Sequence, residues 1–67
     1  MYIVLEIQKN IDGQIATLTN SYETLDLAYQ KYYLVLSAAA VSQLPRHGVI
    51  LISDEIQVLN FDSFDHE

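Results

Sequence analysis

The sequence contains no cysteine, one proline and two glycines among its 67 residues. Without cysteine, neither a disulfide framework nor a thiolate metal site can stabilise the fold, and two separated glycines exclude a glycine-rich phosphate loop. A chain this short buries only about 60% of its unfolded surface when it folds. Small domains compensate with disulfides, metals or oligomerisation. We therefore expect a homo-oligomer, a dimer or larger, that carries no cofactor and no metal.

Positive charge is also scarce. Three Lys and Arg residues stand against nine Asp and Glu, for a formal net charge of −6. Binding to duplex nucleic acid requires several Lys or Arg contacts to phosphates, so we exclude a duplex partner. No apolar run reaches the ~18 residues that span a bilayer, and the start of the chain lacks the basic and small-residue features of a signal peptide. We expect no membrane association and a cytoplasmic location.

The first third of the chain predicts a β-hairpin. Residues Tyr2 to Gln8 alternate between two faces, as a half-buried strand does. The Asp12-Gly13 pair follows, and this dipeptide tolerates the positive φ of a hairpin turn. Residues 15–20 then supply a Thr-rich, β-branched return strand.

One long helix is predicted from Thr24 to Gln43. Thr24 is a candidate N-cap, and Ser21 is a second candidate one turn earlier. Pro45 disfavours helical geometry in the residue before it, so the helix should end near Gln43.

This helix has two apolar faces rather than one. At ~100° per residue, the sheet-facing side should hold seven residues. These are Leu25, Ala28, Tyr29, Tyr32, Leu36, Ala39 and Ala40. The opposite side holds Leu27, Leu34, Ala38 and Val41. A helix that is apolar all round is normally enclosed, so we expect the second set to contact another chain.

The last third predicts a second hairpin. Residues 49–52 form a continuous apolar run, which is typical of a strand covered on both faces, and the helix can cover only one of them. Residues 56–61 alternate again, and residues 62–67 should be a short, frayed acidic tail. The sequence thus predicts a single α+β domain over residues 1–61 with the order ββαββ, in which one helix packs on an antiparallel or mixed sheet.

Several segments resemble a group of short proteins encoded in phages and prophages of Gram-positive bacteria. They are the opening Tyr2–Gln8 strand, the Asp12-Gly13 turn, and the run from Lys31 through Leu36–Ser42 to Pro45 and His47. The resemblance implies a phage origin and a role in virion assembly or in the suppression of a host defence. It assigns no active site.

A small anionic ligand is the candidate partner that the residues suggest. Arg46 and His47 follow the predicted helix, where they stabilise the helix C-terminus. The alternative is anion recognition, in which two Arg46 and two Lys31 side chains of a symmetric dimer converge on a phosphate. Exposed aromatic rings stack on nucleobases, which makes Tyr33 a candidate contact, and Ser42 lies between these positions. The candidate ligand site therefore comprises Lys31, Tyr33, Ser42, Arg46 and His47.

Catalysis has little support in the sequence. A general acid or base works with a partner held in one pocket, yet His47 has no assignable third residue to orient it, and there is no cysteine nucleophile. We therefore expect a non-enzymatic, homo-oligomeric binding protein that sequesters a small anionic, nucleotide-like signal or blocks a host defence protein. The alternative is a structural or assembly accessory of the virion.

Overall fold

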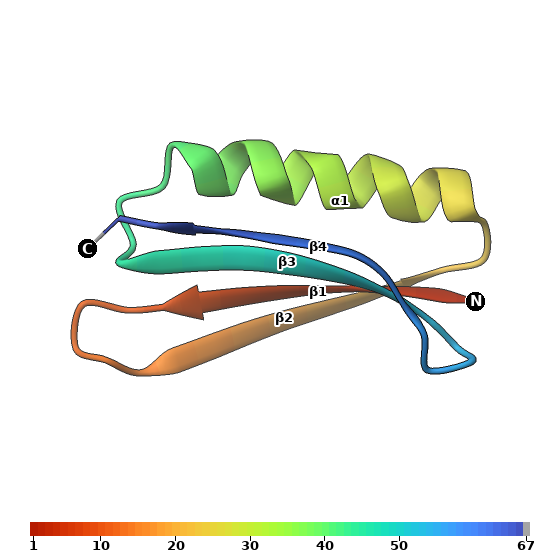
Figure 1. Cartoon of the computed structure of the whole chain (residues 1–67), viewed down its shortest axis with the longest axis horizontal. Helices are drawn as coiled ribbons and strands as arrows, with labels where there is room; N and C mark the ends of the chain where they lie inside the picture. The colour runs from red at the N-terminus through yellow and green to blue at the C-terminus, as the bar shows by residue number, and fades with distance from the viewer. Residues whose placement is uncertain (67) are drawn as a thin grey trace.

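One helix lies across one face of a four-stranded antiparallel sheet in the computed structural model, which describes residues 1–66 (Figure 1). The elements are β1 (Tyr2–Lys9), β2 (Ile15–Tyr22), α1 (Leu25–Ala40), β3 (Arg46–Ser53) and β4 (Val58–Asp65). The strand order is β2-β1-β3-β4. The predicted ββαββ order and α+β class are confirmed, and the sheet is antiparallel throughout.

The turn of the first hairpin forms at the predicted residues. Gly13 has a φ of +88°, and its N–H donates to the Asn10 carbonyl at 2.9 Å. The Asp12 carboxylate accepts a hydrogen bond from the Gln14 N–H at 3.0 Å. Gly13 supplies the positive φ that residues with a Cβ adopt at a cost, which explains why the hairpin turns here.

The helix begins as predicted and ends earlier. The Thr24 hydroxyl accepts from the Leu27 N–H at 3.3 Å, which confirms Thr24 as the N-cap, whereas Ser21 lies inside β2. The helix ends at Ala40 rather than near Gln43. The Ser42 hydroxyl accepts from the Leu44 N–H at 3.1 Å, and such local side-chain bonds compete with helical ones, so the chain turns toward β3 sooner.

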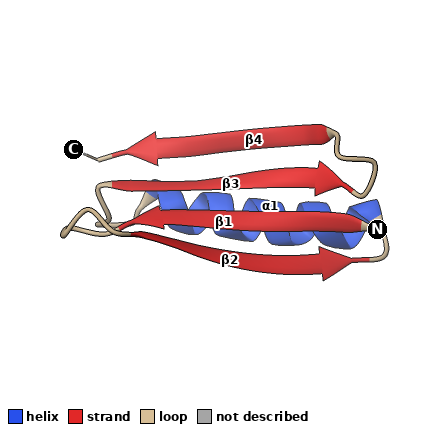
Figure 2. Cartoon of the chain, turned by 90° about the horizontal axis from the view of Figure 1, so that it is seen from below, coloured by secondary structure: helices blue, strands red, loops and turns tan. Residues whose placement is uncertain are grey.

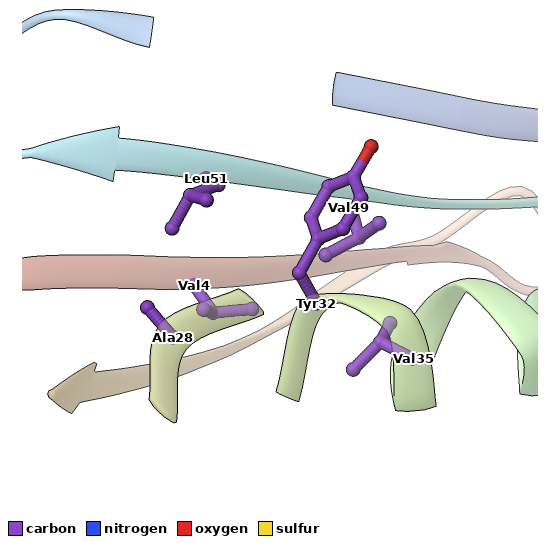
Figure 3. Packing of buried hydrophobic residues seen from close by; sticks show 6 residues of the cluster. All are labelled: Val4, Ala28, Tyr32, Val35, Val49 and Leu51. Carbon is purple, nitrogen blue, oxygen red and sulfur yellow. The ribbon is translucent and has the colours of Figure 1, made fainter. Parts of the chain in front are cut away.

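The core lies between α1 and the two central strands (Figure 3). Its buried hydrophobic members are Val4, Ala28, Tyr32, Val35, Ala39, Val49 and Leu51. Among the residues predicted to face the sheet, Leu25 and Ala40 are exposed, so those two predictions are wrong. Val35, which we did not assign, completes the buried stripe because it lies three residues after Tyr32. Ala40 is turned by ~100° from the buried Ala39, which carries it out of the core.

The second hairpin starts earlier and ends later than predicted. Arg46, His47 and Gly48 belong to β3 and not to a loop, and the first strand residue of β4 is Val58. Ile56 falls in the turn because its φ is +60°, a left-handed conformation that no strand residue adopts.

The predicted acidic tail is part of the sheet up to Asp65. β4 pairs with β3 from Val58 to Asp65, so the expected boundary at residue 61 is wrong for residues 62–65. The His66 N–H continues the contact by donating to the Pro45 carbonyl at 2.8 Å. Glu67, the last residue of the predicted tail, lies outside the described residues.

Candidate functional site

The face of the sheet turned away from α1 is uncovered within one chain, and we refer to it as the open face (Figure 2). Val4, Val49 and Leu51 pack against the helix, so alternation along the strands turns their neighbours to the open face. Cross-strand pairing joins Ile3 to Ile52 and Leu5 to Ile50 on this side. Its apolar residues are Ile3, Leu5, Ile7, Ile15, Ile50, Ile52, Val58 and Phe61.

A hollow of about 450 Å³ opens on this face, lined mainly by residues of β1, β3 and β4 and by Ile15 of β2. Ile7, Ile15, Ile50 and Phe61 supply its apolar walls. Gly48 lies among them, and a Cβ added there would stand 2.8 Å from the Ser63 Cβ. The missing side chain at this position allows β4 to approach β3 and leaves the space open.

One end of the hollow is charged. Lys9 and Arg46 are cross-strand partners on the open face, and both line the hollow. Arg46 also pairs with Asp65 on β4, and its guanidinium donates to the Asp65 carboxylate at 3.1 Å. Both side chains of this ion pair are more than half exposed, and such pairs contribute little free energy. The guanidinium can therefore exchange this partner for another anion at small cost.

A separate polar cluster lies on the helix side of the sheet. The Glu6 carboxylate stands 2.6 Å from His47 Nε2 and accepts from the Gln8 amide at 2.8 Å. An ionised carboxylate can only accept, so Nε2 carries the proton of this bond. The pKa of Glu6 reflects opposing effects: burial raises it, but the hydrogen bonds from His47 and Gln8 and the nearby charges of His47 and Lys31 together lower it.

The other ring nitrogen of His47, Nδ1, is buried and has no hydrogen-bond partner in the described part of the chain. A general base must reach the proton that it abstracts, and a nitrogen enclosed in this way does not meet a substrate. The His47–Glu6 pair is therefore a structural pair in this conformation.

The predicted ligand residues do not form one site. His47 and Lys31 lie near Glu6 on the helix side, while Arg46 is on the open face. The Tyr33 ring is exposed but already stacks on Tyr29, with centroids 5.8 Å apart. Ser42 is engaged with the backbone of its own turn. Within one chain Lys31 and Arg46 lie on opposite sides of the sheet. Their convergence was expected in a symmetric dimer, and it stays a prediction.

Lys9 is the residue near Arg46 that sequence reasoning missed. The alternation that puts Ile3, Leu5 and Ile7 on one face extends by one step to Lys9. This signal was present, but the pairing with Arg46 depends on β3 beginning at Arg46, which the apolar run at residues 49–52 does not indicate.

We call Leu27, Leu34, Ala38 and Val41 the outer stripe of α1, and all four residues are exposed in one chain. The first three lie on α1 away from its buried residues, as the helical phase predicts, and Val41 is the C-cap that follows the helix. The stripe and the open face are thus two apolar surfaces that residues 1–66 leave uncovered.

Across residues 1–66, no three His, Cys, Asp or Glu side chains gather in an arrangement that could hold a metal ion. In that same range no helix combines the length and apolarity needed to cross a membrane. No protein-family model matches the chain, and searches of curated proteins and of solved structures found no match.

Proposed function

We propose that this chain is a non-enzymatic, homo-oligomeric binding protein of phage origin that sequesters a small anionic, nucleotide-like ligand or blocks a host defence protein. One observation carries the ligand part of the proposal. Two of the chain's three Lys and Arg side chains line one hollow, beside an aromatic ring and several aliphatic side chains. A nucleotide has the matching composition, with a flat base and an anionic phosphate.

The two ends of the hollow suit the two parts of such a ligand. Arg46 presents a planar fork of N–H donors, which suits the bidentate binding of phosphate oxygens. Phe61 and Ile50 present apolar surface on which a base can lie, and aromatic rings stack on bases without sequence preference. The net charge of −6 disfavours an anion site elsewhere on the surface, so we place the ligand in this hollow.

The non-enzymatic part of the proposal rests on the enclosure of His47. Its Nδ1 is buried and its Nε2 is bonded to Glu6, so neither ring nitrogen is presented to the hollow. His47 and the hollow also lie on opposite sides of β3.

A thermal-shift panel of mono- and cyclic nucleotides tests the ligand proposal. A ligand at 100 times its Kd stabilises the native state by about 2.7 kcal/mol, which gives a clear rise in Tm for a domain of this size. Arg46→Ala should abolish the rise. Lys31→Ala is the matched control, because it removes one positive charge on the other side of the sheet, and it should leave the rise intact.

Two results would contradict the proposal. A rise in Tm that survives Arg46→Ala would place the ligand elsewhere. No rise with any member of the panel would favour a role as a structural or assembly accessory of the virion, in which the apolar surfaces contact other virion proteins.

A further inference from the structure

We infer that the open face of the sheet is the surface on which a second copy of this chain packs, sheet against sheet. This inference rests on the homo-oligomeric part of the proposed function and names its contact surface. It does not require a bound ligand, although the hollow lies on the same face. It also differs from the sequence-based expectation, which placed the contact on the outer stripe of α1.

The first support is the exposure of large apolar side chains on this face. Ile15, Val58 and Phe61 are 60%, 56% and 71% exposed in one chain. Burial of apolar surface contributes about 25 cal/mol per Å², and contiguous exposed patches mark interaction sites on soluble proteins. Ile3, Leu5 and Ile50 lie between these positions on β1 and β3, so the apolar patch extends over β1, β3 and β4. On β2 the open face holds Ile15 together with Ser and Thr residues.

The second support is the distribution of charge on the open face. Its charged side chains form one row at one end of the sheet, namely Lys9, Arg46 and Asp65. Every other described residue on this face is apolar, Ser, Thr or Gly. A partner must therefore present a flat, uncharged, apolar surface, and the open face of a second copy is such a surface.

Two-fold symmetry suits this arrangement. In an isologous pair, the same patch of each chain meets the other. When the strands of the two copies run in opposite directions, the two charged rows lie at opposite ends of the interface. Each row then stays at a solvated rim, and no charge is buried without a partner.

The third support is area. Four strands of eight residues, at about 3.3 Å per residue and 4.8 Å between strands, span roughly 26 by 19 Å, or ~500 Å² for each copy. Two such faces bury ~1,000 Å² in total, the lower bound for a specific interface. The outer stripe of α1 has four apolar residues, three of them larger than alanine, and offers a narrower contact.

The same packing would change the solvent access of the hollow. Two sheets pack about 10 Å apart, so the second copy would also cover the hollow and exclude water from it.

Light scattering on a size-exclusion column at micromolar concentration provides the test. The wild-type chain should elute with twice the chain mass. Phe61→Glu should elute as a monomer with an unchanged circular dichroism spectrum, because Phe61 is exposed within one chain. Leu34→Glu is the matched control: it introduces the same charge at a Leu that is 60% exposed on α1, and it should remain a dimer.

The outcomes separate the inference from the proposed function. A dimer that Leu34→Glu dissociates and Phe61→Glu does not would overturn the inference and leave the homo-oligomer in place. A wild-type chain that remains a monomer would overturn both the inference and the homo-oligomeric part of the proposed function. In either case the thermal-shift panel tests ligand binding separately.

Single cysteines give a second measurement if Phe61→Glu fails to fold. The chain has no cysteine of its own, so Val58→Cys and Leu34→Cys each introduce one thiol, at positions that are 56% and 60% exposed in one chain. Val58 lies on the open face at the end opposite the charged row. Maleimide should label the Val58→Cys variant more slowly as the protein concentration rises, whereas the labelling rate of the Leu34→Cys variant should stay constant. Concentration-dependent protection at position 34 in place of position 58 would overturn the inference.

Discussion

The two faces of the sheet differ in composition, and the face that is exposed in a single chain is the less polar of the two. The side that α1 covers includes Glu6, Gln8 and His47 beside its apolar residues. The open side is apolar over most of its length and carries charge only in the row of Lys9, Arg46 and Asp65 among the described residues. An isolated sheet with one solvated side normally alternates apolar residues inward and polar residues outward. This sheet instead has two faces that are each suited to being covered.

The covered face depends on a few close contacts. Tyr32 is 1% exposed, and its ring extends from α1 over Val49 with the hydroxyl oxygen pointing toward β4 (Figure 3). Burial raises the pKa of this hydroxyl, and the charge of Asp62 on β4 raises it further. The ring therefore packs between the helix and β3, and its neutral hydroxyl is directed toward β4.

The largest expected effect comes from removing that ring. Tyr32→Ala should destabilise the chain by ~3–5 kcal/mol, as truncation of a buried aromatic usually does. Tyr33→Ala, at a ring that is 56% exposed, should cost less than about 0.5 kcal/mol apart from the loss of its contact with Tyr29. Urea unfolding measures both. Equal losses at the two positions would mean that Tyr33 is also buried in solution, which would be expected if the outer side of α1 were the oligomer contact.

A smaller effect should follow from the polar pair on the covered face. Glu6→Gln replaces a bond to a charged group, which contributes about 1.5–3 kcal/mol, with a neutral one. The folded-state pKa of Glu6 lies below its ordinary value of 4.5. Its contribution to stability is therefore fully present above pH 4.5 and is lost as the pH falls through the folded-state pKa.

Unfolding free energies over a pH series check this assignment. The wild-type curve should fall more steeply below pH 4.5 than that of Glu6→Gln. Glu23→Gln changes an exposed carboxylate and is the matched control, so its curve should follow the wild type. Parallel curves for wild type and Glu6→Gln would contradict a role for the Glu6 charge in stability.

The smallest effect concerns the open face. Gly48→Ala places a Cβ 2.8 Å from the Ser63 Cβ, and overpacking of this kind costs about 1–3 kcal/mol, with the lower end expected because β4 is an edge strand. Ser63→Gly in the same chain should restore part of the loss, because it removes the Ser63 Cβ, while the Asp62 carbonyl oxygen still stands 3.0 Å from the added Cβ. The melting temperatures of the two single variants and the double variant give the coupling. Additive losses would show that the cost arises elsewhere than at the Gly48–Ser63 contact.

The sequence predicts the elements of this fold better than it predicts the site. Alternation, the Asp12-Gly13 turn and the Thr24 cap are local signals, and each is confirmed. The site depends on pairings between distant segments. Arg46 and His47 are consecutive residues of β3, so their side chains point to opposite sides of the sheet. The apolar run at residues 49–52 does not indicate that the strand begins as early as Arg46. Lys9 meets Arg46 only through the β1–β3 register, which no local pattern specifies.

The end of β4 shows a second limit of local signals. Asp62 and Asp65 indicate an exposed acidic tail, yet β3 offers an unpaired edge along its full length, and backbone pairing outweighs the weak strand preference of these side chains. Alternation then turns Asp65 to the open face beside Arg46.

The place of β1 in the sheet has a consequence for how the chain folds. Although β1 comes first in the chain, it lies between β2 and β3, and Val4 meets Leu51 from near the other end of the sequence. The β1–β2 hairpin can close early, but a lone two-stranded hairpin is marginal in water. This hairpin acquires β3 as the second neighbour of β1, and the contacts of the core, only after β3 has been synthesised. Most of the chain must therefore be brought together by loop closure before native contacts can stabilise it. During synthesis the nascent chain should therefore remain unfolded until β3 has left the ribosome, and folding should then proceed as one cooperative step.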